Sequence, residues 1–341
     1  MTEPSPPTPG STAWLNQVIE APLDPERPLI DPHHHLWTGG AGRQPYQLAQ
    51  LWADTGSGHR VDKTVFIECR ASYRSDGPAH LRPLGETEFV ARIARASRDG
   101  GGGALIAGIV GHADLRLPVP QLTDLLQAHA AAADGLFRGI RHAGACDPQP
   151  EALSIPGRAP PGLFADADFR RGLALLGELG YTYDSWHYHH QNADFAALAR
   201  AVPATTLVLD HFGTPLGVGR FAGQRAAVFA QWQRDIEAIA ACPNVVAKLG
   251  GLAMPDNGYG WHQRALPPSS DEVVEAQAAW YHHAIACFGP ARCLFESNFP
   301  VDRRSLGYGV YWNAMKKLAA AYPAADQQAM FHDNAARVYR L

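Results

Sequence analysis

Two histidines that could share a metal ion follow the first strongly apolar run of the sequence. Residues 28–30 lead into His33, His34 and His35. Alternate residues of a strand point to one face, so we expect His33 and His35 to face inward and His34 outward. Neutral imidazole is a good ligand for zinc or manganese. A divalent site is therefore one interpretation, and a pair of hydrogen-bonded core histidines is the other.

A second histidine-rich segment ends the run that begins at residue 180. The same alternation places His187 and His189 on one face. One of them could complete a metal site, and the sequence does not decide which. The alternative is a histidine-rich surface loop.

A buried apolar run, residues 205–209, delivers Asp210-His211-Phe212-Gly213. Gly213 allows the backbone to approach a ligand closely. We therefore predict that His211 is an active-site histidine, with a packing histidine as the alternative.

The run that starts at residue 292 ends in candidate acids. Glu296 and Asn298 share a face of a regular strand, and Asp302 lies beyond it. A carboxylate here could be the general base that activates a water molecule. Because an amide takes up no proton at neutral pH, Asn298 could contribute only in another way, and Glu296 and Asp302 remain as acids.

Charged residues interrupt three apolar runs. Glu68 lies in the second run, Arg138 and Arg141 in the fourth, and Lys248 in the seventh. Buried charges are costly unless they are paired or used. Guanidinium groups suit substrate carboxylates, so these residues either bind an anionic substrate or form structural pairs such as Glu68 with an arginine.

Eight apolar or β-branched runs alternate with alanine-rich segments of helical spacing. This alternation predicts a parallel sheet, and eight units predict an α/β (β/α)₈ TIM barrel. We expect residues 26–341 to form this single domain. The Pro-, Ser- and Thr-rich residues 1–25 are expected to be a disordered tail. The runs are residues 28–37, 63–71, 104–115, 136–142, 180–190, 205–213, 244–251 and 292–300.

Composition narrows the class of protein. The 341 residues carry a formal net charge of −4, which argues against a dedicated nucleic-acid binder. No apolar run is long enough for a membrane span, and the amino end lacks the pattern of a secretory signal. The five cysteines are an odd number and include no CxxC pair, which is typical of a protein in a reducing cytoplasm. A homo-oligomer is compatible with the alanine-rich helices, although no specific residue indicates one.

Three motifs together resemble the amidohydrolase-related TIM-barrel family of predicted metal-dependent hydrolases. They are Asp31-x-His33-x-His35, Leu209-Asp210-His211-Phe212-Gly213 and Phe295-Glu296-Ser297-Asn298-Phe299-Pro300. The branch includes sugar-acid lactonases and 2-pyrone-4,6-dicarboxylate lactonase. The resemblance runs from about Pro28 to the end of the chain.

The resemblance implies hydrolysis of a small carboxylated cyclic ester or a related ester or amide. It makes His33 and His35 the first-strand pair, His211 the active-site histidine, and Arg138 and Arg141 the holders of a substrate carboxylate. The family commonly has Ser-Asp-Trp-Pro after the eighth strand, where this chain has Asn298 in place of the aspartate. Members differ in metal use, so hydrolysis with or without one divalent ion is expected.

Two other functions remain open. A metal-dependent decarboxylase of an aromatic or enol acid would use the same first-strand histidines, although it normally keeps the aspartate replaced here by Asn298. A non-catalytic ligand-binding barrel would explain that replacement as lost activity.

Overall fold

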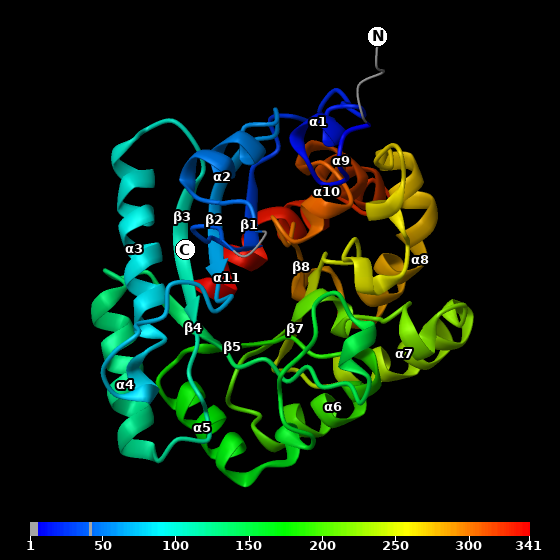
Figure 1. Cartoon of the computed structure of the whole chain (residues 1–341). Coiled ribbons are helices and arrows are strands. Elements are labelled where there is room, and N and C mark those ends of the chain that lie inside the picture. The colour runs from blue at the N-terminus through cyan, green and yellow to red at the C-terminus, as the bar shows by residue number, and fades with distance from the viewer. Residues whose placement is uncertain (1–5, 41–42) are drawn as a thin grey trace.

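Eight parallel strands follow one another around a barrel in chain order. The computed structural model describes residues 6–40 and 43–341. Each of the eight predicted runs overlaps one strand, although β2 begins two residues before its run. Each strand pairs with the next, so the predicted (β/α)₈ TIM barrel is confirmed. Figure 1 shows the strands enclosed by helices. The strands are β1 (Leu29–His34), β2 (Val61–Ile67), β3 (Leu105–Gly111), β4 (Phe137–Arg141), β5 (Thr182–Ser185), β6 (Leu207–Leu209), β7 (Val245–Leu249) and β8 (Cys293–Phe295).

The last strand returns beside the first. His35 N donates a hydrogen bond of 2.8 Å to Phe299 O, and a parallel bridge joins His34 to Phe299. This contact brings the residues that follow β8 next to the histidines that follow β1. Active-site groups of such barrels lie at these carboxyl ends of the strands.

Helices cover the outside of the barrel. The 19-residue α8 begins with a capping box, in which Ser269 and Glu272 satisfy each other's backbone N–H groups. Among the described helices, none is both long and apolar enough to cross a membrane. The helices are α1 (Thr12–Leu15), α2 (Leu48–Thr55), α3 (Leu84–Asp99), α4 (Val119–Ala132), α5 (Ala167–Glu178), α6 (Asn192–Ala201), α7 (Arg225–Ala240), α8 (Ser270–Phe288), α9 (Tyr308–Ala319), α10 (Ala324–Gln328) and α11 (Asn334–Tyr339).

The period of two along each strand divides the core into two layers. Leu29 and Phe66 belong to the layer between strands and helices. Their neighbours Ile30 and Val65 belong to a separate inner cluster, which α11 joins through its own apolar side chains. The inner cluster consists of Ile30, Val65, Ile67, Val110, Val208, Val246, Leu294, Ala335, Val338 and Tyr339.

The prediction of a disordered tail is wrong for the segment that includes α1. Trp14 is fully buried, and its Nε1 donates to Arg264 O at 3.0 Å. Farther along, the Glu20 carboxylate accepts hydrogen bonds from the backbone N and Oγ of Ser270. A buried tryptophan removes a large apolar area from water, and this burial stabilises the segment although its composition is polar. Residues 1–5 lie outside the described residues.

Candidate active site

Glu296 lies between two histidines at the centre of the barrel mouth. Its Oε1 is 2.6 Å from His211 Nδ1 and hydrogen-bonded to it. Its Oε2 is 2.6 Å from His33 Nδ1, in an ion-pair contact that is not aligned as a hydrogen bond. The side chains of Glu296 and His33 are fully buried, and that of His211 is nearly so. The structure therefore brings together three of the residues that the sequence nominated.

The backbone at His211 is held in an uncommon conformation. His211 has a φ of 54°, and Phe212 and Thr214 also have positive φ values. Such left-handed residues cost about 1–3 kcal/mol each and cluster at functional sites. Gly251 faces the imidazole, and a Cβ at that position would lie 2.3 Å from His211 Nδ1. The turn after β6 and the glycine after β7 together place this ring against Glu296.

Burial and charge act in opposite directions on the pKa of His211. Burial lowers it, but the neighbouring carboxylates of Glu296 and Asp210 outweigh burial and leave the pKa raised. Because Nδ1 faces Glu296, the opposite nitrogen, Nε2, is the one that can exchange a proton with a substrate or water.

His33 and His35 face each other as the alternation of the first strand predicts. Their Nε2 atoms are 3.3 Å apart. His35 Nδ1 lies 2.8 Å from Ile67 O, which orients the ring. His34 points the other way, where Nε2 meets Thr64 Oγ1 at 3.1 Å.

Lys248 lies beneath His33 and is fully buried. Its Nζ is 2.7 Å from Asp184 Oδ2, 3.3 Å from Asp210 Oδ1 and 3.3 Å from His33 Nδ1. Burial lowers the pKa of Lys248, but the surrounding carboxylates outweigh burial and raise it. Of the two alternatives for Lys248, substrate contact or structural pair, this placement agrees with the structural pair, because two aspartates surround the ammonium group.

The two arginines predicted to bind substrate lie at opposite ends of β4. Arg141 donates through Nε to Glu68 Oε1 at 3.0 Å and through Nη2 to Glu68 O, while its Nη1 is 3.4 Å from His33 Nε2. Arg138 instead donates to the backbone carbonyls of Gly135 and Ala107 at the amino end of the strand. Arg138 thus lies away from the central histidines, because residues three apart on a short strand differ in face and in depth.

Asn298 and Asp302 form a buried pair beside the histidines. Asn298 Nδ2 donates to Asp302 Oδ1 at 2.9 Å, and the backbone N of Ala253 donates to Asp302 Oδ2 at 3.1 Å. Burial raises the pKa of Asp302 to about 7, although His211 and these hydrogen bonds oppose the rise. Asn298 thus donates a hydrogen bond to the Asp302 carboxylate and is not itself an acid.

His187 and His189 do not reach the central histidines. His187 contacts Ser185 Oγ and Asn192 Oδ1 at 2.9 and 3.0 Å, and His189 Nδ1 accepts from Leu216 N at 3.2 Å. Strand β5 ends at Ser185, so the alternation of a regular strand no longer applies to the residues that follow. Neither belongs to the group of described residues whose ligand atoms lie within 4.8 Å of one another.

Several polar residues of the site were not predicted. Asp31 accepts hydrogen bonds from Ser297 N, Ser297 Oγ and Tyr308 OH at 2.9, 2.5 and 2.9 Å. Asp184 holds Lys248. Asp31 and Asp184 each lie inside an apolar run, ahead of His33 and His187. This position was the available signal, because a buried carboxylate needs hydrogen-bonding partners.

The donor set fits one divalent ion. Two ligand nitrogens at about 2.0–2.1 Å from a tetrahedral zinc ion lie roughly 3.3 Å apart, which matches the 3.3 Å between the Nε2 atoms of His33 and His35. Metal-binding histidines usually direct their other nitrogen at a carboxylate or carbonyl oxygen, as these two do. Among the described residues, Glu296 Oε2 accepts no hydrogen bond and lies 2.6 Å from His33 Nδ1. The Asp210 oxygens instead lie in ion-pair contacts, 3.3 Å from Lys248 Nζ and 3.7 Å from Arg141 Nη1. His33, His211 and Glu296 offer ligand atoms within 4.8 Å of one another.

The chain belongs to the amidohydrolase family. The family model described as Amidohydrolase matches residues 30–341. The protein is thus a hydrolase of the amidohydrolase superfamily, a family whose members commonly bind a metal.

Two curated relatives span nearly the same length. An uncharacterized protein, y4mH, from Sinorhizobium fredii is 32% identical, and the alignment covers 92% of this chain and 98% of that protein. An L-fucono-1,5-lactonase from Burkholderia multivorans is 30% identical, with 92% and 96% covered.

Solved structures of relatives share the barrel. An amidohydrolase from Burkholderia multivorans, solved with bound zinc, has a TM-score of 0.70 and 26% identity over 92% of this chain and 99% of that one. A 2-pyrone-4,6-dicarboxylic acid hydrolase described as putative, from Pseudomonas putida, has a TM-score of 0.59 and 18% identity, covering 92% and 97%. The second likeness concerns the fold alone.

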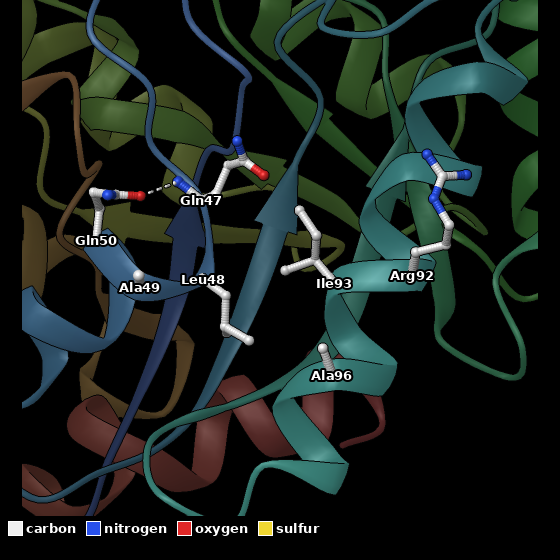
Figure 2. Close-up of a pocket in the computed structure, with 7 residues that line it drawn as sticks. All are labelled: Gln47, Leu48, Ala49, Gln50, Arg92, Ile93 and Ala96. Carbon is white, nitrogen blue, oxygen red and sulfur yellow. Dashed lines mark hydrogen bonds between the residues drawn. The ribbon is translucent and has the colours of Figure 1, made fainter.

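A shallow groove on the outer surface is separate from this site. It lies between α2 and α3 and is lined by Leu48, Arg92 and Ile93, among others (Figure 2). Gln47 N donates to Gln50 Oε1 at 3.0 Å along its edge. The groove contains none of the histidines or acids of the barrel mouth.

Proposed function

We propose that the protein hydrolyses a small carboxylated lactone and uses His211 as the general base. The observation that carries this proposal is the hydrogen bond of 2.6 Å between His211 Nδ1 and Glu296 Oε1. A carboxylate on one ring nitrogen fixes the tautomer and leaves the other nitrogen to accept a proton. The similarity to an L-fucono-1,5-lactonase supports a cyclic ester as the substrate.

His211 Nε2 removes a proton from water while the water oxygen bonds to the lactone carbonyl carbon. The Glu296 carboxylate beside Nδ1 stabilises the imidazolium that forms. When the ring C–O bond breaks, His211 returns the proton to the departing oxygen. One lactone and one water give one hydroxy acid, and the histidine ends in its initial state.

Arg141 is the residue that we assign to the substrate carboxylate. Glu68 engages Nε and Nη2, and Nη1 remains directed at the central histidines. A guanidinium held in this way offers donors in a fixed direction, which favours a planar anion. Glu68 therefore orients Arg141 and does not itself contact the substrate.

His33 and His35 would hold a divalent ion through their Nε2 atoms. Such an ion supplies a Lewis acid that polarises the carbonyl group. Glu296 and Ile67 O fix the two rings from the opposite side. The buried ammonium group of Lys248 offsets part of the negative charge of Asp184 and Asp210 below the two imidazole rings.

Acid release from a panel of carboxylated and neutral lactones tests the proposal. We expect turnover by the native protein and loss of turnover in His211→Asn. The matched control is His189→Asn, which alters a buried histidine outside the cluster. Release of CO₂ from aromatic or enol acids would instead support a decarboxylase. Tight binding of lactones without turnover would support a ligand-binding barrel.

A further inference from the structure

The last helix closes the amino end of the barrel and sends one hydroxyl group into its centre. Arg340, which follows α11, donates to Gly180 O and Arg138 O, two groups at the amino ends of β5 and β4. Tyr339 is fully buried within the inner apolar cluster. Helix α11 packs against β1 and β8, and Figure 1 shows it beside β1.

The Tyr339 hydroxyl reaches the charged layer above this cluster. It donates a hydrogen bond of 2.6 Å to Asp184 Oδ2. The same oxygen accepts from Lys248 Nζ at 2.7 Å. The Lys248 ammonium also lies 5.3 Å from the centre of the Tyr339 ring, within the range of a cation–π interaction.

Lys248 connects this pair to the candidate active site. Its Nζ is 3.3 Å from His33 Nδ1, the atom that faces Glu296. A continuous chain of contacts therefore runs from Tyr339 through Asp184 and Lys248 to His33.

We propose that Tyr339 is a positioning residue, which fixes Asp184 and thereby holds Lys248 against His33. Two donors on one carboxylate oxygen restrict its rotation more than one donor does. Packing alone does not call for the hydroxyl, because Val338 and Ala335 already supply apolar contacts to the same cluster. A hydroxyl buried there is costly unless it is hydrogen-bonded, and Asp184 is its partner.

Lysine NMR tests the placement without any assay of activity. The chain has four lysines, which are Lys63, Lys248, Lys316 and Lys317. Lysine labelled with ¹³C at Cε gives four resolvable groups of signals, and Lys248→Met identifies that of Lys248. We expect Tyr339→Phe to shift the Lys248 signal and leave the other three in place. Val338→Ala, which removes packing from the same helix, should leave the Lys248 signal unmoved.

The kinetic arm rests on the proposed hydrolase function. We expect Tyr339→Phe to lower kcat about tenfold, the size of one lost hydrogen bond to a charged group, with KM changed less than twofold. In an Asp184→Asn background the same substitution should cause no further loss. A native protein inactive on every lactone, with the Lys248 signal still shifted, would refute the function and support the positioning role. An unmoved Lys248 signal in Tyr339→Phe would overturn the inference.

Discussion

Glu296 Oε1 and His211 Nδ1 are 2.6 Å apart in a fully buried site, although 85 residues separate them in the sequence. The carboxylate comes from the end of β8 and the imidazole from the turn after β6, where His211 has a φ of 54°. In the proposed mechanism this pairing leaves Nε2 of the histidine as the proton-accepting nitrogen. His211 is therefore a candidate base in a site where the resemblance leads one to expect an aspartate at the position of Asn298.

Substitution of either partner should abolish most of the hydrolysis. We expect His211→Asn and Glu296→Gln each to lower kcat at least about a hundredfold, the usual contribution of a general base. Their combination should lose little more than either alone, because the two residues act as one unit. Steady-state kinetics of the three variants measure this. Additive losses would show that Glu296 acts independently of His211.

Metal content should depend on the first-strand histidines. Elemental analysis of the purified protein should give about one zinc or manganese ion per chain. His35→Asn should lose it, because one of two nitrogens at ligand spacing is removed. His189→Asn should retain it, since His189 lies outside the cluster. Metal in His35→Asn at the native level would exclude this pair as the binding site.

The planar guanidinium group of Arg141 should determine the affinity for carboxylated substrates. Arg141→Lys keeps the charge beside Glu68 and so avoids an unpaired buried carboxylate, but it loses the planar donors. We expect KM for a carboxylated lactone to rise about tenfold, with little change for the analogue that lacks the carboxylate. Arg138→Lys is the matched control. Equal effects on both substrates would place Arg141 in the site for another purpose.

The barrel was predictable because eight apolar runs alternate with helical segments, and that pattern depends only on local sequence. The pairing of His33 with His35 was predictable for the same reason. His187 and His189 were not, because β5 ends at Ser185 and the following turn has no fixed alternation. The Glu296–His211 contact depends on tertiary closure, so the sequence could nominate both residues but could not join them.

A buried histidine remote from the site should make stability depend on pH. Burial lowers the pKa of His129 to about 4, although its contact with His112 O opposes the shift. Between pH 4 and the unfolded value near 6.5, the unfolded chain binds a proton that the folded chain does not, so the free energy of unfolding rises with pH. The rise from this residue is at most about 3 kcal/mol.

Chemical denaturation of the native protein and His129→Gln across this range measures the effect of His129. The difference in free energy of unfolding between the two should grow from pH 4 to 6.5 and then stay constant. A difference independent of pH would show that His129 titrates alike in both states.

Exchanging the two residues of the Asn298–Asp302 pair should destabilise the protein less than substituting Asn298 alone. Asn298→Asp places a second carboxylate 2.9 Å from Asp302 Oδ1, and two buried like charges at that distance oppose folding. Asn298 also has a φ of 56°, which asparagine accepts more readily than most residues. We therefore expect Asn298→Asp to lower both thermal stability and activity.

The double variant Asn298→Asp/Asp302→Asn restores one donor and one acceptor and should recover most of the stability. Thermal unfolding and lactone hydrolysis of the single and double variants give the comparison. A gain of activity in Asn298→Asp, from a native protein without any, would show instead that the native chain is a ligand-binding barrel whose base was lost at this position. Loss of existing activity would assign Asn298 a working role in holding Asp302.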